Sequence, residues 1–269
     1  MSNNELAALN IEWVEIPAGT FIKGLTVAQR RLLYKELKRR LGGLRQVWWE
    51  NRLLFRQGQR ALGYDVHGKL GEVVESEPVY LERFYISRYP ITMIQYTTHQ
   101  RQIGAVVHYD DQRTIADGWG KLPQMASFYM AQQFCRSHGL RLPTSDEWEK
   151  AARGTDGRLY PWGNTWDPTR GNVVRELAQK LPKDRPARGN YTSEVDAYPT
   201  GQSVYGVQDL VGNIQEWTSE GRLRRWPIKA DDRVAWLFNV LAFEGNIEAG
   251  WENTGFYVGF RVVCDQLPE

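Results

Sequence analysis

The stretch that decides the fold is RLPTSDEWEKAARG, residues 141–154. Thr144 or Ser145 can cap the first turn of a helix, two acidic residues follow in that turn, and a glycine ends the run. Trp148, Ala151 and Ala152 form the predicted inner face. We therefore expect a short helix from about Ser145 to Arg153 with Trp148 packed inside.

A second stretch, YGVQDLVGNIQEWT (residues 205–218), carries as much information. Three shorter segments flank the pair in chain order: IPAGTF (16–21), YPWGN (160–164) and VGFRVV (258–263). These landmarks closely resemble the formylglycine-generating (sulfatase-modifying factor) family, which has an R-L-P-T-x-x-E-W-E-x-A-A-R-G helix and a Y-G-x-x-D-x-V-G-N-x-x-E-W-T loop. The resemblance spans roughly residues 11–265 and implies an α+β, C-type-lectin-like fold.

The bulk composition sets limits but names no ligand. With landmarks from end to end, we expect the 269 residues to form a single domain over residues 1–269. A net charge of +2 is too small to indicate a polyanionic partner for the whole chain. No apolar run approaches the roughly 18 residues that a membrane span needs, and residues 1–5 lack a signal-sequence pattern. We expect no membrane partner and, by default, a cytoplasmic protein, although a phage particle or non-classical export fits the same sequence.

A long basic insertion follows the first strand, at about residues 25–75, where the family usually has a short loop. Thr26 can cap a helical run of leucines, Gly42-Gly43 breaks it, and the pattern resumes from Leu44 to Leu62. From Thr26 to Tyr64 there are ten Lys or Arg against two Glu. The basic face is either a solvated surface of a packed hairpin or a docking surface for nucleic acid or an acidic partner.

Elsewhere the local patterns predict alternating strands and helices. Residues 11–22 and 77–87 are predicted as strands, with an interruption in the first at Pro17-Ala18-Gly19. Thr92 can cap a helix, a polar loop is expected through Asp110, Asp111 and Asp117, and a helix is expected from about Ser127 to His138. Turn residues indicate loops from Gly154 to Val195.

The catalytic chemistry of the resembled family is missing. An active formylglycine-generating oxidase binds copper(I) through two cysteines placed before the closing Gly-Phe-Arg, and soft thiolates suit Cu(I). Here residues 233–257 contain no cysteine, and Cys264 lies beyond Gly259-Phe260-Arg261. Cys135, on the predicted inner face of a helix, is expected to be a buried structural thiol. The four scattered histidines form no metal or catalytic motif. We therefore expect no copper and no catalytic residues.

The V-G-N-x-x-E loop of the family binds calcium, which the resemblance transfers to Gly212, Asn213, Ile214 and Glu216. Hard oxygen donors on a tight loop suit Ca²⁺. The alternative is that Asn213 and Glu216 only hydrogen-bond the loop. A second family site would begin at Asn172-Val173, but its acidic partner is not evident near Gly189-Asn190-Tyr191. The sequence thus predicts at most a structural calcium ion.

The segment that replaces the copper site is rich in aromatic and amide side chains between glycines. Its candidate ligand-binding residues are Trp236, Phe238, Asn239, Phe243, Glu244, Asn246, Trp251, Asn253, Phe256 and Tyr257. Such a mixture is typical of binding loops, although the aromatics can also fill the core beneath the terminal strands. Its position before a closing Gly-Phe-Arg-Val-Val resembles the variable region of target proteins of diversity-generating retroelements.

These observations predict a non-catalytic binding protein that contacts a macromolecular partner through residues 236–257. A divergent formylglycine-generating oxidase is the first alternative. An interaction module that acts through the basic insertion is the second.

Overall fold

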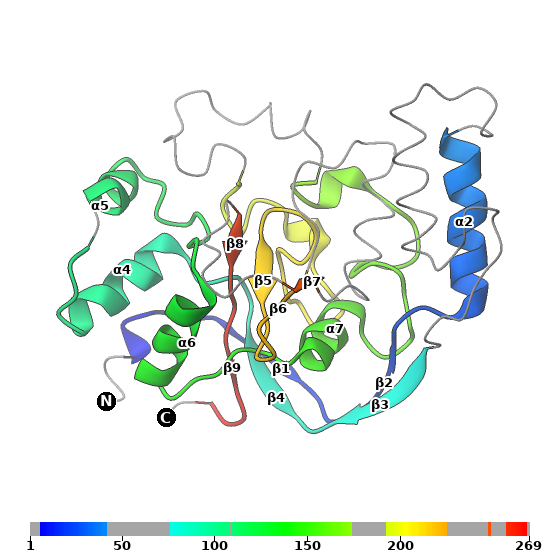
Figure 1. Ribbon diagram of the computed structural model, residues 1–269, viewed down its shortest axis with the longest axis horizontal. Helices are drawn as coiled ribbons and strands as arrows, with labels where there is room; N and C mark the ends of the chain where they lie inside the picture. The colour runs from blue at the N-terminus through cyan, green and yellow to red at the C-terminus, as the bar shows by residue number, and fades with distance from the viewer. Residues whose placement is uncertain are drawn as a thin grey trace.

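A computed structural model of the chain describes residues 6–41, 76–107, 109–173, 192–224, 247–248 and 257–267 (Figure 1). The α-helices in this part of the chain are α2 (Val27–Leu41), α4 (Met93–Gln102), α5 (Tyr109–Ala116), α6 (Phe128–Ser137) and α7 (Ser145–Arg153), with short 3₁₀ turns η1 (Pro168–Arg170) and η2 (Pro199–Gly201). The strands are β1 (Trp13–Ile16), β2 (Gly19–Lys23), β3 (Glu77–Leu81), β4 (Phe84–Ser87), β5 (Gln215–Trp217), β6 (Arg222–Arg224), β7 (Ile247–Glu248), β8 (Val258–Gly259) and β9 (Val263–Cys264). The predicted α+β class is confirmed.

Three small sheets join distant parts of the chain. In the first, β4 pairs antiparallel with both β1 and β9, so strands from the two ends of the chain share one sheet. The second consists of β2 and β3, and the third has the order β7-β6-β5-β8, with β5 and β8 parallel. Figure 1 shows α6 and α7 on either side of the central strands β5, β8 and β9.

Two buried clusters hold these layers together. One surrounds α6 and contains Phe134, Trp217 and Phe260, whereas the other lies against α7 and contains Trp148 and Val263. Trp148 is fully buried, as the sequence predicts. Because both clusters draw on β8, β9 or the residues between them, the C-terminal strands are fixed on two sides.

The decisive helix has the predicted bounds because its end signals are strong and local. Thr144 accepts a hydrogen bond from the Glu147 N–H and the Glu147 carboxylate accepts from the Thr144 N–H, which completes a capping box. Gly154 ends α7 at φ 69°, a left-handed value that favours glycine. Thr92 caps α4 in the same reciprocal way with Gln95.

Two expectations need correction. The predicted strand over residues 77–87 is two strands, β3 and β4, that belong to different sheets. The region around Asp110 and Asp111 is helix α5, not a polar loop. Its eight residues, YDDQRTIA, contain too few apolar positions to show a 3.6-residue period, so the pattern did not reveal the helix.

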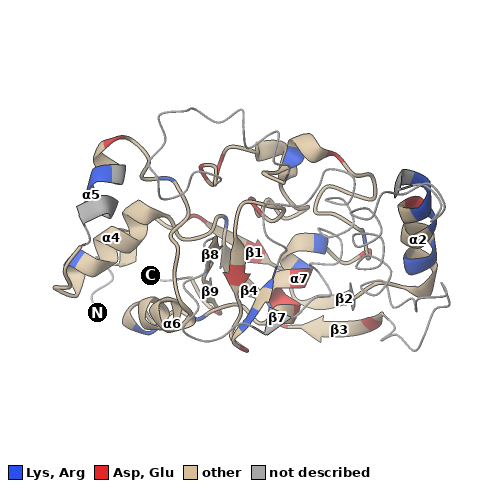
Figure 2. Ribbon diagram, turned by 45° about the horizontal axis from the view of Figure 1, so that its top comes forward, with Lys and Arg blue, Asp and Glu red and all other residues tan. Residues whose placement is uncertain are grey.

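The first helix of the basic insertion is α2, and the prediction that Thr26 caps it is confirmed by the Gln29 N–H, which donates to the Thr26 hydroxyl at 3.1 Å. Leu33, Tyr34 and Leu37 are buried. Arg31, Lys35 and Lys38 are exposed, and Figure 2 shows basic residues along α2. The remainder of the insertion lies outside the described residues. Among the described helices, none has the length and apolar character that a bilayer crossing requires.

A buried pair of histidines links α4 to the end of α6. His99 Nδ1 lies 3.0 Å from His138 Nε2, and both rings pack against Phe134. Burial, and then the proximity of His138, lowers the pKa of His99 from 6.5 to about 4. The folded protein therefore keeps His99 neutral at pH values where the unfolded chain takes up a proton.

This difference predicts an acid-sensitive stability. The contribution of neutral His99 to the free energy of unfolding is fully present above pH 6.5 and is lost as the pH falls toward 4. The free energy of unfolding should be about 2 kcal/mol lower at pH 5 than at pH 7 from this group alone. Urea unfolding at both pH values measures it, and His99→Leu should flatten the dependence. An equal pH dependence in the variant would contradict the assignment.

Candidate functional site

In the sequence, the C-terminal segment lies between two strands that flank β5, and β7 within this stretch pairs with β6. β6 ends at Arg224 and β8 begins at Val258, and β5 pairs with both. Most of the predicted contact residues lie in between, outside the described residues: Trp236, Phe238, Asn239, Phe243, Glu244, Asn246, Trp251, Asn253 and Phe256. We use the word frame for strands β5, β6 and β8 together with the buried side chains that bond to them. These side chains are Trp148, Glu149, Glu216, Arg224 and Arg261.

Tyr257 is the predicted contact residue that the structure does describe. Its carbonyl accepts a hydrogen bond from the Gln215 N–H at 2.7 Å, which fixes its backbone to β5. Its φ is 80°, an uncommon value for a bulky residue. The side chain is partly exposed, so it does not belong to the fully buried core. Tyr257 therefore stands at the re-entry point of the segment with a fixed backbone and accessible surface.

A buried ion pair forms the centre of the frame. Arg261 donates to both carboxylate oxygens of Glu216, from Nε to Oε2 at 2.6 Å and from Nη2 to Oε1 at 2.9 Å, and both side chains are fully buried. The Trp148 indole N–H donates to Glu216 Oε2 at 2.8 Å. The same guanidinium also donates to three backbone carbonyls, those of Ser87, Arg88 and Gln208. Arg261 thus ties β5 to the end of β4, and Trp148 joins α7 to the same carboxylate.

A second buried ionic cluster holds the exit point of the segment. Glu149 on α7 pairs with Arg153 one turn later, and its other oxygen lies 3.8 Å from Arg224 Nη1. Arg224 also donates to the Ser145 carbonyl at 2.9 Å. The Gly24 N–H donates to Glu149 at 2.7 Å, so the same carboxylate fixes the residue that leads into α2. Helix α7 is therefore the common support of both ends of the segment.

The loop before β5 is held by a compact set of amide hydrogen bonds. Asn213 Nδ2 donates to Asp209 at 2.7 Å and to the Ser193 carbonyl at 3.1 Å, while its Oδ1 accepts from the Ser193 N–H at 2.8 Å. Asn172 Nδ2 donates to the same Oδ1 at 3.3 Å. A side chain on Gly212, at φ +76°, would place its Cβ 2.3 Å from the Asn172 carbonyl oxygen, so this position requires glycine.

The predicted calcium ligands are close together but do not fit a calcium ion as they are placed. Calcium takes about six to eight oxygen ligands. Here both oxygens of Glu216 already accept hydrogen bonds from Arg261, and the side-chain oxygen of Asn213 accepts from the Ser193 N–H. Among the described residues, no three His, Cys, Asp or Glu side chains form a metal-binding group. The side-chain oxygens of Glu216 and Asn213 are thus already used by donors within the protein.

We therefore expect a chelator to leave the thermal stability unchanged, because the loop is closed by its own hydrogen bonds. Calorimetry with and without a chelator, followed by elemental analysis, measures this. A fall in melting temperature that added Ca²⁺ reverses would contradict the expectation and support the calcium site that the sequence predicts, since a ligand of the folded state stabilises it by mass action.

Both cysteines of the chain lie in the hydrophobic cluster around α6. Burial raises the pKa of Cys135 to about 12 and that of Cys264 to about 11. Thiolates are the metal ligands and the nucleophiles of cysteine chemistry. Neither cysteine presents a thiolate near neutral pH, and the prediction of a buried Cys135 is confirmed.

Sequence reasoning missed the frame arginines. In the sequence, Arg261 is one charge in the otherwise apolar stretch VGFRVV, and its partner Glu216 was assigned to calcium. A charged residue inside an apolar stretch is itself a signal, because buried charges are almost always paired.

Comparisons with known proteins identify the family and the fold of the chain. Residues 45–266 match the family described as sulfatase-modifying factor enzyme 1-like domain. The inactive C-alpha-formylglycine-generating enzyme 2 of Bos taurus is 46% identical over 92 residues, which cover 33% of this chain and 29% of that protein.

Two solved structures show the same fold. PvdO from Pseudomonas aeruginosa has a TM-score of 0.59 and 16% identity and covers 95% of each chain. Treponema denticola variable protein 1 has a TM-score of 0.51 and 18% identity over 73% of this chain and 89% of its own. The family match covers most of the sequence. This chain therefore belongs to the sulfatase-modifying factor enzyme 1-like family, with its C-type-lectin-like fold.

Proposed function

We propose that this protein is a non-catalytic binding protein that contacts a macromolecular partner through residues 236–257. The observation that carries the proposal is the frame: described residues on both sides of the segment in the sequence are held by buried ion pairs, Arg224 by Glu149 on α7 and Arg261 by Glu216 on β5. A rigid support reduces the entropy that a binding loop loses on contact. The segment itself supplies the aromatic and amide side chains typical of paratopes.

The loss of oxidase chemistry supports the same proposal. The segment contains no cysteine, and the two cysteines of the chain are buried in their protonated form. A relative named as inactive indicates that this family includes members without catalysis. The fold shared with a protein named as variable supports a finer proposal, that the segment is a variable region of the retroelement type.

The test compares the partners bound by the wild-type protein with those bound by a variant whose segment has been replaced. Cross-linking with mass spectrometry, on wild type and on a variant with residues 236–256 replaced by a Gly/Ser linker, identifies partners that depend on the segment. With such a partner purified, Tyr257→Ala should weaken binding by about 30-fold, since contact-centre aromatics contribute about 2 kcal/mol or more.

Tyr129→Ala is the matched control, because Tyr129 is 65% exposed on α6. It should leave both affinity and melting temperature unchanged. Partners that cross-link equally to both proteins, or a Tyr257→Ala variant with unchanged affinity, would overturn the proposal.

The basic face of α2 is a second candidate surface. Arg31, Lys35 and Lys38 are exposed on it, and all three lie within one helix. If an acidic partner or nucleic acid binds there, affinity should fall steeply with salt. Replacing the three residues by Gln tests this surface without touching the frame.

A further inference from the structure

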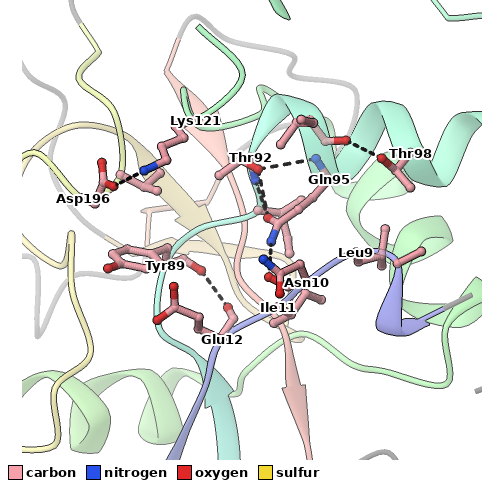
Figure 3. Close-up of a pocket in the computed structure, with 15 residues that line it drawn as sticks. Leu9, Asn10, Ile11, Glu12, Tyr89, Thr92, Gln95, Thr98, Lys121 and Asp196 are labelled. Carbon is pink, nitrogen blue, oxygen red and sulfur yellow. Dashed lines mark hydrogen bonds and ion pairs between the residues drawn. The ribbon is translucent and has the colours of Figure 1, made fainter. Parts of the chain in front are cut away.

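A cavity of about 300 Å³ opens between the N-terminal segment, the start of α4 and two loops (Figure 3). Its described lining residues belong to none of the strands β5, β6 and β8 that make up the frame. It is therefore a separate feature from the C-terminal segment, and neither the family match nor the proposed binding function accounts for it.

The inner part of the cavity is apolar and firmly held. Leu9, Ile91 and Val195 are buried at its floor, and Ile11 is partly buried beside them. Ligand pockets usually measure about 300–1,000 Å³. A volume at the lower end of this range, with an apolar floor, fits a small molecule that carries a short aliphatic group.

The polar wall beside the floor is occupied by bonds within the protein. Gln95 Oε1 accepts from the Thr92 N–H at 2.9 Å, and the Thr98 hydroxyl donates to the Ile94 carbonyl at 2.9 Å. Figure 3 shows these side chains along one side of the cavity. These side chains shape the cavity, but their polar atoms are already bonded. A ligand would therefore bind through the charged groups on the opposite side of the cavity.

Two oppositely charged side chains lie next to each other at the rim of the cavity, on the side opposite Gln95 and Thr98. Lys121 Nζ lies 2.6 Å from Asp196 Oδ2, and the side chains are 62% and 35% exposed. An exposed ion pair contributes little to stability. A ligand that offers a carboxylate to Lys121 and an ammonium group to Asp196 can therefore replace the internal contact with two of its own at little cost.

Tyr89 and Glu12 complete the rim on the same side (Figure 3). Burial, and then the charge of Glu12, raises the pKa of Tyr89, so its phenol stays protonated and can donate a hydrogen bond. Glu12 pairs with Arg88 at 3.1 Å outside the cavity lining. With two carboxylates and one ammonium group among the lining residues, the rim carries both signs of charge, with negative charge in excess.

We propose that this cavity binds a small zwitterion, a free α-amino acid with a short aliphatic side chain. The side chain would lie on Leu9 and Ile91, the ligand carboxylate on Lys121, and the ligand ammonium group on Asp196. The match rests on three features at once: the small volume, the apolar floor and the adjacent opposite charges.

Thermal shift and calorimetric titration with three related probes test the proposal. Leucine has both charges, leucine methyl ester lacks the carboxylate, and N-acetylleucine lacks the ammonium group. Leucine should raise the melting temperature at millimolar concentration, and each blocked probe should bind about tenfold more weakly, the effect of losing one charged contact.

Single variants then assign each charge to its partner. Lys121→Met should abolish the difference between leucine and its methyl ester, and Asp196→Asn should abolish the difference between leucine and N-acetylleucine. Lys23→Met is the matched control, because Lys23 forms a comparable ion pair with Asp146 at 2.9 Å elsewhere. The absence of binding by leucine, or probe preferences that persist in both cavity variants, would overturn the proposal.

Discussion

Arg261→Met is expected to lower the free energy of unfolding by about 3–5 kcal/mol, because it leaves the fully buried carboxylate of Glu216 without its compensating charge. The variant also removes the donors to three backbone carbonyls, which join the residues between β8 and β9 to the end of β4 and to Gln208. Urea unfolding followed by tryptophan fluorescence measures the loss.

A double variant separates the effect of leaving Glu216 unpaired from the effect of losing the arginine side chain. Glu216→Gln combined with Arg261→Met removes both charges while the Gln amide oxygen still accepts from Trp148. It should be at least about 1 kcal/mol more stable than Arg261→Met alone, because no charge is then buried without a partner.

Arg113→Met is the matched surface control. Arg113 forms an ion pair at 3.8 Å with Asp117, and both side chains are mainly exposed. Exposed pairs contribute about 0–1 kcal/mol. A similar loss of stability in Arg113→Met and Arg261→Met would show that the buried pair does not hold the frame.

Trp148→Ala should destabilise the protein by about 3–5 kcal/mol, since it opens a cavity at a fully buried position of α7. It also removes a hydrogen bond to Glu216, so the loss of stability has two causes: the lost packing and the lost hydrogen bond to the frame. The same unfolding measurement applies, and an unchanged melting temperature would show that α7 is not the support of the core.

Trp148→Phe distinguishes the two contributions. It keeps much of the ring volume and removes the indole N–H, so a smaller loss of about 1–3 kcal/mol is expected. If both variants lose the same stability, the hydrogen bond to Glu216 rather than packing dominates at this position.

Sequence reasoning succeeded where the deciding interactions are local. The bounds of α7 followed from Thr144 and Gly154, because a cap and a helix stop act within a few residues. The caps of α2 and α4 were found for the same reason. In contrast, α5 has few apolar residues and gave no periodic signal.

The frame could not be derived from the sequence because its contacts are long-range. Glu216 and Arg261 are 45 residues apart, and Trp148 is 68 residues from Glu216. A single sequence shows the three residues but not that they meet. The resemblance to a calcium loop therefore gave Glu216 a role that its position beside a guanidinium does not favour.

The candidate contact residues are a different case. Their chemical types pointed to binding, and Tyr257 lies partly exposed where the segment rejoins the frame. The other nine lie outside the described residues and stay predictions. What the structure adds is the buried ion pairs of Arg224 and Arg261, which flank the segment in the sequence and which the residue types alone did not reveal.

Oxidation of a thiol substrate tests the central claim most directly. The protein is incubated with copper(I), oxygen and a cysteine-containing peptide, beside an active formylglycine-generating enzyme as a control, and the peptide is followed by mass spectrometry. Because the segment carries no cysteine and both cysteines of the chain are buried, the account predicts that the peptide stays unchanged while the control converts it. Copper-dependent formation of the aldehyde by this protein would contradict the account and establish it as an oxidase.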